Sequence, residues 1–346
     1  MPPIGKTQRL HVSMRMRLIA FTIFLLGVEL FGGEGITKDR TPVKLVADSI
    51  RTLTMPPFSM RGVQCDDSGN LYFASGFHPR RGVVLKLSTT GSTVLYKVTD
   101  ADIEDPLLED FQVTAERKVW MLAASGKKNK PYVIQFNADD PASANTIRLK
   151  VPEGLKATSI RSFGILANDK IVVSGYVDAS APKRERNREY LAVFDDTGKL
   201  IRESFQEVSK DVWKHLFGMA TAAREGGVTY LLQLDKILVV SPTGEVSRTI
   251  PLTPPAPGFR PVLIKVNRRR LAIEFVKPKG DDPLGGELDA VFAVLDATTG
   301  EVLRVYEPTS EVGPPLACFS DEGFTFVHFN FDRKPPYLSL VTTAVK

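Results

Sequence analysis

The sequence predicts an all-β protein, a six-bladed β-propeller with four-stranded antiparallel blades, and two observations carry this prediction. One is a recurring phrase in which polar residues, a Thr and a Gly separate two runs of alternating apolar residues, at Gly91, Gly198, Gly244 and Gly300. Glycine at the end of such a turn supplies the positive φ that closes a β-hairpin. The other is the spacing, because the later copies lie about 50 residues apart, as propeller blades do. Between the first two copies one unit has lost its glycine.

Each blade needs a first hairpin as well, and the chain supplies six of them. They lie in the segments GVQCDDSGNLYFAS, FQVTAERKVWMLAAS, FGILANDKIVVSGY, GMATAAREGGVTYLLQ, VLIKVNRRRLAIEFV and ACFSDEGFTFVHFN. In the second unit, a long turn at 137–143 stands where the glycine is missing. These hairpins predict six blades.

The last blade lacks an outer strand, because the chain ends soon after residues 337–343. Residues 43–54, which precede the first blade, form a spare strand. Pairing this strand with the last blade removes the sheet edges that an open array exposes. We therefore predict that an N-terminal strand completes the last blade and that residues 43–346 form one domain.

The segment Asp66–Ala74, with the letters DDSGNLYFA, resembles the turn and strand signature of six-bladed propellers of the NHL and TolB-like kind. This resemblance implies the fold over nearly the whole of residues 43–346, and it assigns no catalytic residue. Functions in that broad group range from protein binding to lactone and phosphotriester hydrolysis, so the fold does not choose among them.

Residues 1–35 have the layout of a secretory signal. A basic segment at 14–17 precedes an apolar run at 18–26, and small residues follow at 31–35. The apolar run is too short for a comfortable membrane span, and Glu29 interrupts its extension. We expect export to the periplasm or the extracellular space with no stable membrane span after processing; a buried or fraying N-terminal helix is the alternative.

The net charge is +5, and the leader contributes part of it through Lys6, Arg9, Arg15 and Arg17 against two glutamates. The remainder is too small to indicate a nucleic-acid partner.

Counting back from each first hairpin places five polar residues at the tops of the inner strands, where propellers commonly bind ligands. They are Arg61, Asp110, Arg161, His215 and Arg260. Guanidinium groups bind carboxylate or phosphate, so this set suits an anionic ligand at the channel mouth. The alternative is that these side chains pair with one another or with water.

The loops on the same end are rich in cations and predict a basic rim. The predicted rim residues are Arg80, Arg81, Lys127, Lys128, Arg184, Arg186, Arg188, Lys277 and Arg333. An acidic run at 100–110 opposes them, and solvated surface is the alternative interpretation.

Cys65 and Cys318 lie at nearly the same level of the inner strand in the first and last blades, which are neighbours across the closure of the ring. We predict either a disulfide there or two buried thiols.

The sequence favours a binding module over an enzyme, because it has no histidines at metal-ligand spacing, no nucleophile elbow and no nucleotide loop. The expected partner is a protein, a peptide, a glycan or a small anion, with no cofactor or metal. Two alternatives stay open: a calcium-dependent hydrolase or lyase of the lactonase or phosphotriesterase type, and an assembly protein without a ligand.

Overall fold

The computed structural model describes residues 41–54, 60–75, 82–100, 103–125, 130–137, 140–151, 158–177, 188–207, 221–279, 288–330 and 337–344. Within residues 42–346 the strands form six separate sheets, each with four antiparallel strands in meander order, and one sheet gains a fifth strand. This confirms the predicted six-bladed β-propeller.

The first three blades contain only strands that follow one another in the chain. Blade 1 consists of β3 (Met60–Cys65), β4 (Leu71–Ser75), β5 (Val83–Leu87) and β6 (Thr93–Lys97). Blade 2 consists of β7 (Pro106–Val113), β8 (Lys118–Ser125), β9 (Pro131–Asn137) and β10 (Asp140–Arg148). Blade 3 consists of β11 (Thr158–Ile165), β12 (Ile171–Val177), β13 (Arg188–Phe194) and β14 (Leu200–Glu207).

The other three blades follow the same plan until the ring closes. Blade 4 consists of β15 (Ala222–Glu225), β16 (Val228–Leu232), β17 (Lys236–Val240) and β18 (Val246–Pro251). Blade 5 consists of β19 (Arg260–Asn267), β20 (Arg270–Pro278), β21 (Leu288–Asp296) and β22 (Val302–Glu307), with β1 (Val43–Lys44) added outside. Blade 6 consists of β23 (Leu316–Phe319), β24 (Gly323–Asn330), β25 (Tyr337–Ala344) and β2 (Ser49–Thr54).

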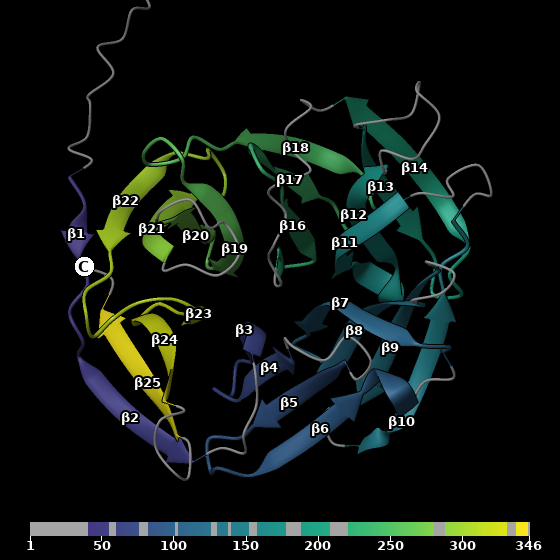
Figure 1. Cartoon of the computed structure of the whole chain (residues 1–346). Helices are drawn as coiled ribbons and strands as arrows, with labels where there is room; N and C mark the ends of the chain where they lie inside the picture. Colours follow the sequence, from purple (N-terminus) through teal and green to yellow (C-terminus); the bar gives the residue numbers. More distant parts are fainter. Residues whose placement is uncertain are drawn as a thin grey trace, which may run out of the picture. The chain divides into compact units, whose positions relative to one another are not determined.

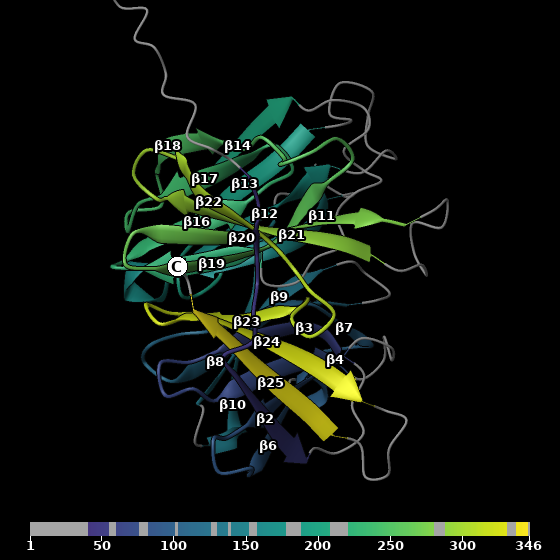
Figure 2. The ribbon, with the colours of Figure 1, turned by 90° about the vertical axis from the view of Figure 1, so that its left-hand side faces the viewer.

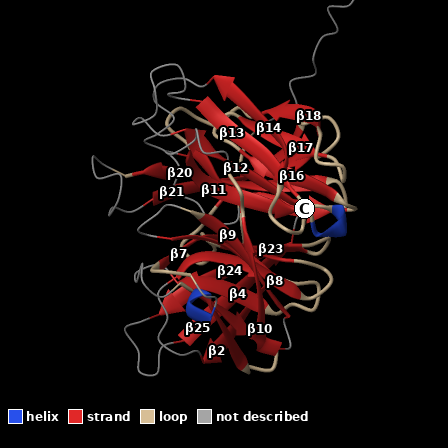
Figure 3. Cartoon of the chain, turned by 90° about the vertical axis from the view of Figure 1, so that its right-hand side faces the viewer, coloured by secondary structure: helices blue, strands red, loops and turns tan. Residues whose placement is uncertain are grey.

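The first strand of each blade is the innermost one. These six strands contact one another in the cyclic order β3, β7, β11, β15, β19, β23 and back to β3. Figure 1 looks along the axis of this ring, with β3, β7, β11, β19 and β23 near the centre and β6, β14, β18, β22 and β2 at the periphery. The two 3-10 segments, η2 (Val98–Asp100) and η3 (Ala167–Asp169), are short turns among strands, as the colours of Figure 3 show. No helix in the described part of the chain is long and apolar enough to span a membrane.

The N-terminal segment closes the ring as predicted, but it serves two blades. Ser49–Thr54 pairs antiparallel with β25, with Ser49 opposite Thr342, and Figure 2 shows β2 beside β25 in blade 6. The preceding residues, Val43 and Lys44, pair parallel with β22 of blade 5. The expected single strand over 43–54 is therefore two strands, and together they join the last two blades.

Buried apolar side chains fill the space between every two neighbouring blades. Six clusters of buried residues correspond to the six blade interfaces in the described part of the chain. Trp120 packs between blades 2 and 3, for example, and Phe292 between blades 5 and 6. Both faces of each sheet are covered, which explains why the middle strands are almost continuously apolar.

The glycine of the Thr-Gly turn has a second role besides its positive φ. At Gly198 (φ 76°) a Cβ atom would lie 2.1 Å from the carbonyl oxygen of Arg148, so the turn of blade 3 packs directly on the outer strand of blade 2. The N–H of Lys150 donates to the carbonyl of Gly198 at 2.8 Å. At Gly91 (φ 91°) nothing lies within 4 Å of such an atom. Only some of these turns, therefore, depend on glycine for blade packing.

Arginines of the outer strands stabilise the contact between the turn of one blade and the outer strand of the preceding blade. Arg51, Arg202 and Arg248 each occupy the third position of an outer strand and reach the last turn of the next blade. They donate to the carbonyl of Thr89, to Glu245 at 3.1 Å, and to the carbonyls of Ala297 and Thr298, respectively. The pattern Gly-x-x-x-Arg repeats at Gly198, Gly244 and Gly300, so the sequence contains this signal, although we did not predict the contact from it.

Candidate functional site

The structure describes only part of the predicted channel mouth. Asp110 in β7 is completely buried, and Arg260 begins β19 and is partly buried. Arg61 and Arg161 lie in β3 and β11, but their side chains lie outside the described part, as does the whole of His215. The convergence of these five side chains therefore stays a prediction.

A recurrent β-bulge changes the level at which these residues lie. The inner strands of five blades skip one residue in their pairing with the second strand, and the skipped residues are Arg61, Glu109, Arg161, Val262 and Ala317. In blade 2 the bulged residue is Glu109, so Asp110 lies one position nearer the turn than Arg61 and Arg161 do. A bulge redirects side chains and interrupts their alternation; Arg61 and Arg161 are themselves the bulged residues, whereas Asp110 follows the bulge.

Polar side chains near the axis satisfy backbone groups of neighbouring inner strands. An inner strand has only one partner in its own sheet, so its other edge has N–H and C=O groups that need hydrogen bonds. The Gln64 amide donates to the carbonyl of Phe111 at 2.7 Å and accepts from the N–H of Val113 at 3.1 Å. Gln112 donates to the carbonyl of Phe163 at 2.8 Å. These two glutamines join blades 1, 2 and 3 at the axis.

Lys265 and Glu274 of blade 5 make similar contacts, Lys265 with blade 1 and Glu274 with the neighbouring blade 6. Lys265 Nζ donates to the carbonyl of Val63 at 2.9 Å, and Glu274 Oε2 accepts from the N–H of Leu316 at 3.1 Å. Burial lowers the pKa of Lys265 to about 7, while Glu274 and Asp110 act in the opposite direction. Burial also raises the pKa of Glu274 to about 7, against the lowering effects of the Leu316 N–H and of Lys265.

Sequence reasoning missed these capping residues, although a signal was present. Gln64, Gln112 and Lys265 occupy the same position, three residues after the bulge of the inner strand. A polar residue at a fixed place in an otherwise apolar strand is typical of a shared structural role. Asp110 adds a local contact, since its Oδ1 accepts the N–H of Phe111 at 2.8 Å. The polar groups that we describe at the axis are thus engaged in holding the ring together.

The two cysteines lie at the closure of the ring. Cys65 of β3 and Cys318 of β23 form a disulfide in the structure, with their Cα atoms 5.6 Å apart. This separation falls in the ordinary range for a disulfide. The bond joins blade 1 to blade 6, between strands that share no backbone ladder.

Two residues of the predicted basic rim are described. Arg188 is partly buried, and its guanidinium lies 5.4 Å from the centre of the Phe205 ring. Lys277 is exposed, and its aliphatic stem lies against Gly258. The remaining rim residues lie outside the described part, and these are Arg80, Arg81, Lys127, Lys128, Arg184, Arg186 and Arg333.

Lys277 belongs to a ribbon that extends beyond its own blade. The pairing of β19 with β20 ends at Arg260 opposite Val276, whereas β20 and β21 pair as far as Pro278 opposite Leu288. The ribbon carries Lys277, an ion pair of 3.4 Å between Lys279 and Asp289, and Leu288, which is 48% exposed. We refer to residues 276–279 and 288–291 as the blade 5 ribbon. It lies at the end of the ring where the connections between second and third strands emerge, which we refer to as the loop-bearing end.

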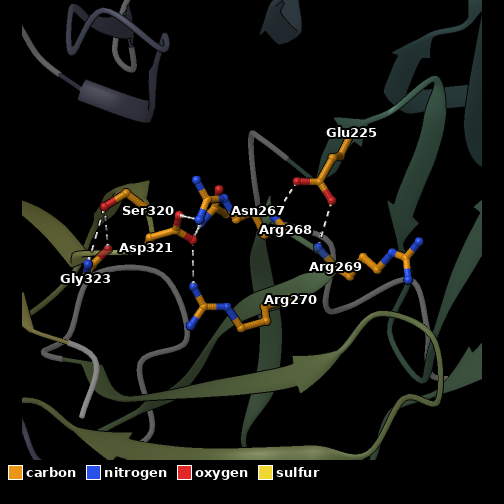
Figure 4. Close-up of polar contacts among 8 residues, drawn as sticks. All are labelled: Glu225, Asn267, Arg268, Arg269, Arg270, Ser320, Asp321 and Gly323. Atoms are coloured by element: carbon orange, nitrogen blue, oxygen red, sulfur yellow. Dashed lines mark hydrogen bonds and ion pairs between the residues drawn. The ribbon is translucent and has the colours of Figure 1, made fainter.

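At the opposite, turn-bearing end, carboxylates anchor a hairpin rich in arginine (Figure 4). Glu225 of blade 4 accepts the N–H groups of Arg268 and Arg269, the latter at 2.8 Å, and both of these residues have positive φ. Asp321 of blade 6 pairs with the side chains of Arg268 and Arg270. Bulky residues rarely adopt this backbone conformation, and the two carboxylates stabilise it. These contacts connect blades 4, 5 and 6.

Comparisons with known proteins add the following. No protein-family model and no curated protein sequence matches the chain. The Pan2 WD40 domain of Neurospora crassa is 10% identical with a TM-score of 0.48, over 88% of this chain and 99% of that one. A luciferin-regenerating enzyme is 10% identical with a TM-score of 0.48, over 85% of this chain and 95% of that enzyme's chain.

A third solved structure, the calcium-binding protein regucalcin from Agrobacterium tumefaciens, is 12% identical with a TM-score of 0.38, over 78% of this chain and 98% of the regucalcin chain. The six-bladed fold rests on the strand order of this chain itself, and the resemblance to NHL and TolB-like propellers holds at the level of fold. Within the described residues, no group of three or more His, Cys, Asp or Glu is placed to hold a metal ion.

Proposed function

We propose that this protein is an exported binding module that recognises an anionic partner, such as an acidic protein or peptide, at its loop-bearing end. The blade 5 ribbon carries this proposal. It extends beyond the neighbouring strands and presents an exposed cation, Lys277, which makes no ion pair with any described residue. Leu288 supplies exposed apolar surface on the same ribbon. A cation at the rim of a contact surface attracts an anionic partner over a distance, and exposed apolar surface beside it is available for contact.

The polar side chains described at the axis support the same proposal, because their hydrogen bonds hold the blades together. Gln64, Gln112, Lys265 and Glu274 all hydrogen-bond to backbone groups of other blades. Recognition is therefore assigned to the loops and strand ends, which differ from blade to blade. The proposal includes no metal or organic cofactor.

Export is supported by the signal-like leader and by the disulfide, because disulfides persist in oxidising compartments. The test is expression of the full chain in a bacterium with a cell envelope, fractionation of periplasm and medium, and sequencing of the mature N-terminus. Recovery of uncleaved chain in the cytoplasm alone would contradict export.

The binding proposal is tested by charge reversal at the two ends of the ring. Lys277→Glu alters the blade 5 ribbon, and Lys199→Glu is the matched control, since Lys199 is an exposed lysine in a turn at the opposite end. The native extracytoplasmic extract is passed over each immobilised protein, and bound proteins are identified by mass spectrometry. A partner retained by the wild type and by the control but lost with Lys277→Glu supports the proposal. A partner retained equally by all three proteins places recognition elsewhere.

A further inference from the structure

Two side chains of blade 5 hold the strands that carry the cysteines. Lys265 donates to the carbonyl of Val63 in β3, and Glu274 accepts from the N–H of Leu316 in β23. Val63 lies two residues before Cys65, and Leu316 lies two residues before Cys318. Each contact thus lies two residues before a cysteine in the sequence, with a β-bulge at Ala317 in between on the β23 side.

We propose that Lys265 and Glu274 position β3 and β23 so that Cys65 and Cys318 form their disulfide. Both are positioning residues, because they act through the backbone of Val63 and Leu316 and not through the sulfur atoms. This role is independent of the partner-binding function proposed above.

The reason such positioning is needed lies in the topology. Strands β3 and β23 belong to different sheets, so no backbone ladder fixes their relative height. A disulfide requires Cα atoms within about 7 Å of each other, and the observed separation is 5.6 Å. A slip of one residue along a strand moves a Cα by about 3.3 Å, which is enough to prevent the bond. Side-chain hydrogen bonds from a third blade supply the register that a ladder would otherwise give.

The position of each contact also fits this role. In a strand, residues two apart direct their backbone groups toward the same edge. In β3 the pairing is unshifted from Gly62 to Cys65, so holding the carbonyl of Val63 orients the edge on which Cys65 lies. In β23 a bulge at Ala317 separates Leu316 from Cys318, and the contact at the N–H of Leu316 fixes the strand directly before this bulge. Both contacts involve an ionisable side chain, and each hydrogen bond is stronger when that side chain is charged.

Lys265 and Glu274 depend on each other, because Glu274 is buried, Lys265 is partly buried and the two side chains carry opposite charges when ionised. The pKa of each is shifted toward neutrality by burial and partly restored by the other group. Removing one leaves the other without its counter-charge in a medium of low dielectric constant. Loss of either residue is therefore expected to disturb both contacts.

The bond forms by ordinary thiol–disulfide exchange with glutathione disulfide as the oxidant. The thiolate of one cysteine attacks a sulfur of glutathione disulfide, giving a mixed disulfide and one glutathione thiolate. The thiolate of the second cysteine attacks the cysteine sulfur of the mixed disulfide and releases the second glutathione thiolate. Two electrons pass to glutathione, and the two thiol protons pass to the buffer.

The experiment compares four full-length proteins in glutathione redox buffers: wild type, Lys265→Met, Glu274→Gln and Gln112→Met. Gln112→Met is the matched control, because it removes an inner-strand cap of the same kind between blades 2 and 3, away from the cysteines. After equilibration the thiols are trapped by alkylation, and the fraction of bonded protein is measured by mass spectrometry. These data give the equilibrium constant of disulfide formation.

We expect the equilibrium constant to fall at least tenfold in Lys265→Met, which corresponds to about 30 mV for this two-electron couple. We expect a fall of at least threefold in Glu274→Gln, which keeps an acceptor for Leu316 but loses the charge, and a change of less than twofold in Gln112→Met. Equal constants in all four proteins, or a fall in Gln112→Met as large as in Lys265→Met, would overturn the proposal. If circular dichroism shows that Lys265→Met is unfolded, the comparison of Glu274→Gln with Gln112→Met decides by the same criterion.

Discussion

Removal of the disulfide should reduce stability mainly through the unfolded chain. The bond between Cys65 and Cys318 spans 253 residues, and the chain-entropy relation gives about 5 kcal/mol for a loop of that length at 25 °C. The perturbation is the double substitution Cys65→Ser and Cys318→Ser. With a urea dependence of about 3 kcal/mol per molar, which suits a chain of this size, the midpoints should differ by roughly 1.5 to 2 M.

The assay is urea unfolding of the oxidised wild type and of the double variant, followed by circular dichroism and tryptophan fluorescence. Wild type treated with a reductant is the control, and it should match the variant if the serines themselves have no effect. Because the cross-link restricts the unfolded ensemble, the difference should appear in the refolding rate and leave the unfolding rate nearly unchanged. Coincident midpoints would refute the reasoning, and so would a difference confined to the unfolding rate.

Three further predictions concern the contacts between blades. Lys265→Met should make the urea midpoint fall more steeply between pH 5 and 8 than in wild type. Burial already raises the pKa of Glu274 to about 7, and loss of the lysine raises it further, so the stability present at low pH is lost as the pH increases. In wild type Lys265, whose pKa burial lowers to about 7, offsets this loss above neutrality, and the variant lacks this effect. Parallel pH curves for the two proteins would count against this account. Gly91→Ala should lower the free energy of unfolding by about 1 to 2 kcal/mol, for the left-handed backbone alone. Gly198→Ala should lower it by at least about 2 kcal/mol more, because its Cβ meets a backbone carbonyl of blade 2. Equal losses of stability in thermal unfolding would show that the turn moves freely. Arg248→Ala should lower the free energy of unfolding by about 1 to 2 kcal/mol, because it removes hydrogen bonds to the last turn of the next blade. Arg304 occupies the equivalent exposed position before the ring closure, and Arg304→Ala should change the free energy of unfolding by less than about 0.5 kcal/mol. A larger loss in Arg304→Ala than in Arg248→Ala would contradict the role of this repeat.

The parts of the fold that depend on nearby residues could be predicted from the sequence. The turns at Gly91 and Gly198 are local, because one residue with positive φ between two apolar runs is sufficient to indicate a hairpin. The closing strand followed from the missing fourth strand of the last blade. Its division into β1 and β2 did not, because Val43 is paired by the far edge of blade 5 rather than by any property of its own sequence.

The polar contacts near the axis were harder to predict because they join residues far apart in the chain. Lys265 is 202 residues from Val63, and no spacing rule links them. The bulges at Arg61, Glu109 and Arg161 were not predicted, because a bulge leaves no clear mark in the sequence. Cys65 and Cys318 were correctly placed in neighbouring blades, but the distance between two inner strands is a property of the closed ring.

The double use of the N-terminal segment has a consequence for the order of events at the ribosome. Ser49 pairs with Thr342, which is made 293 residues later, and at 5 to 20 residues per second that interval is about 15 to 60 s. During this time the strand that finishes the last blade exists without the sheet it belongs to. A nascent chain cannot complete its circle before the residues of β25 have been made. Truncations at the two ends are equivalent in this sense, because shortening either one removes a strand from the same sheet.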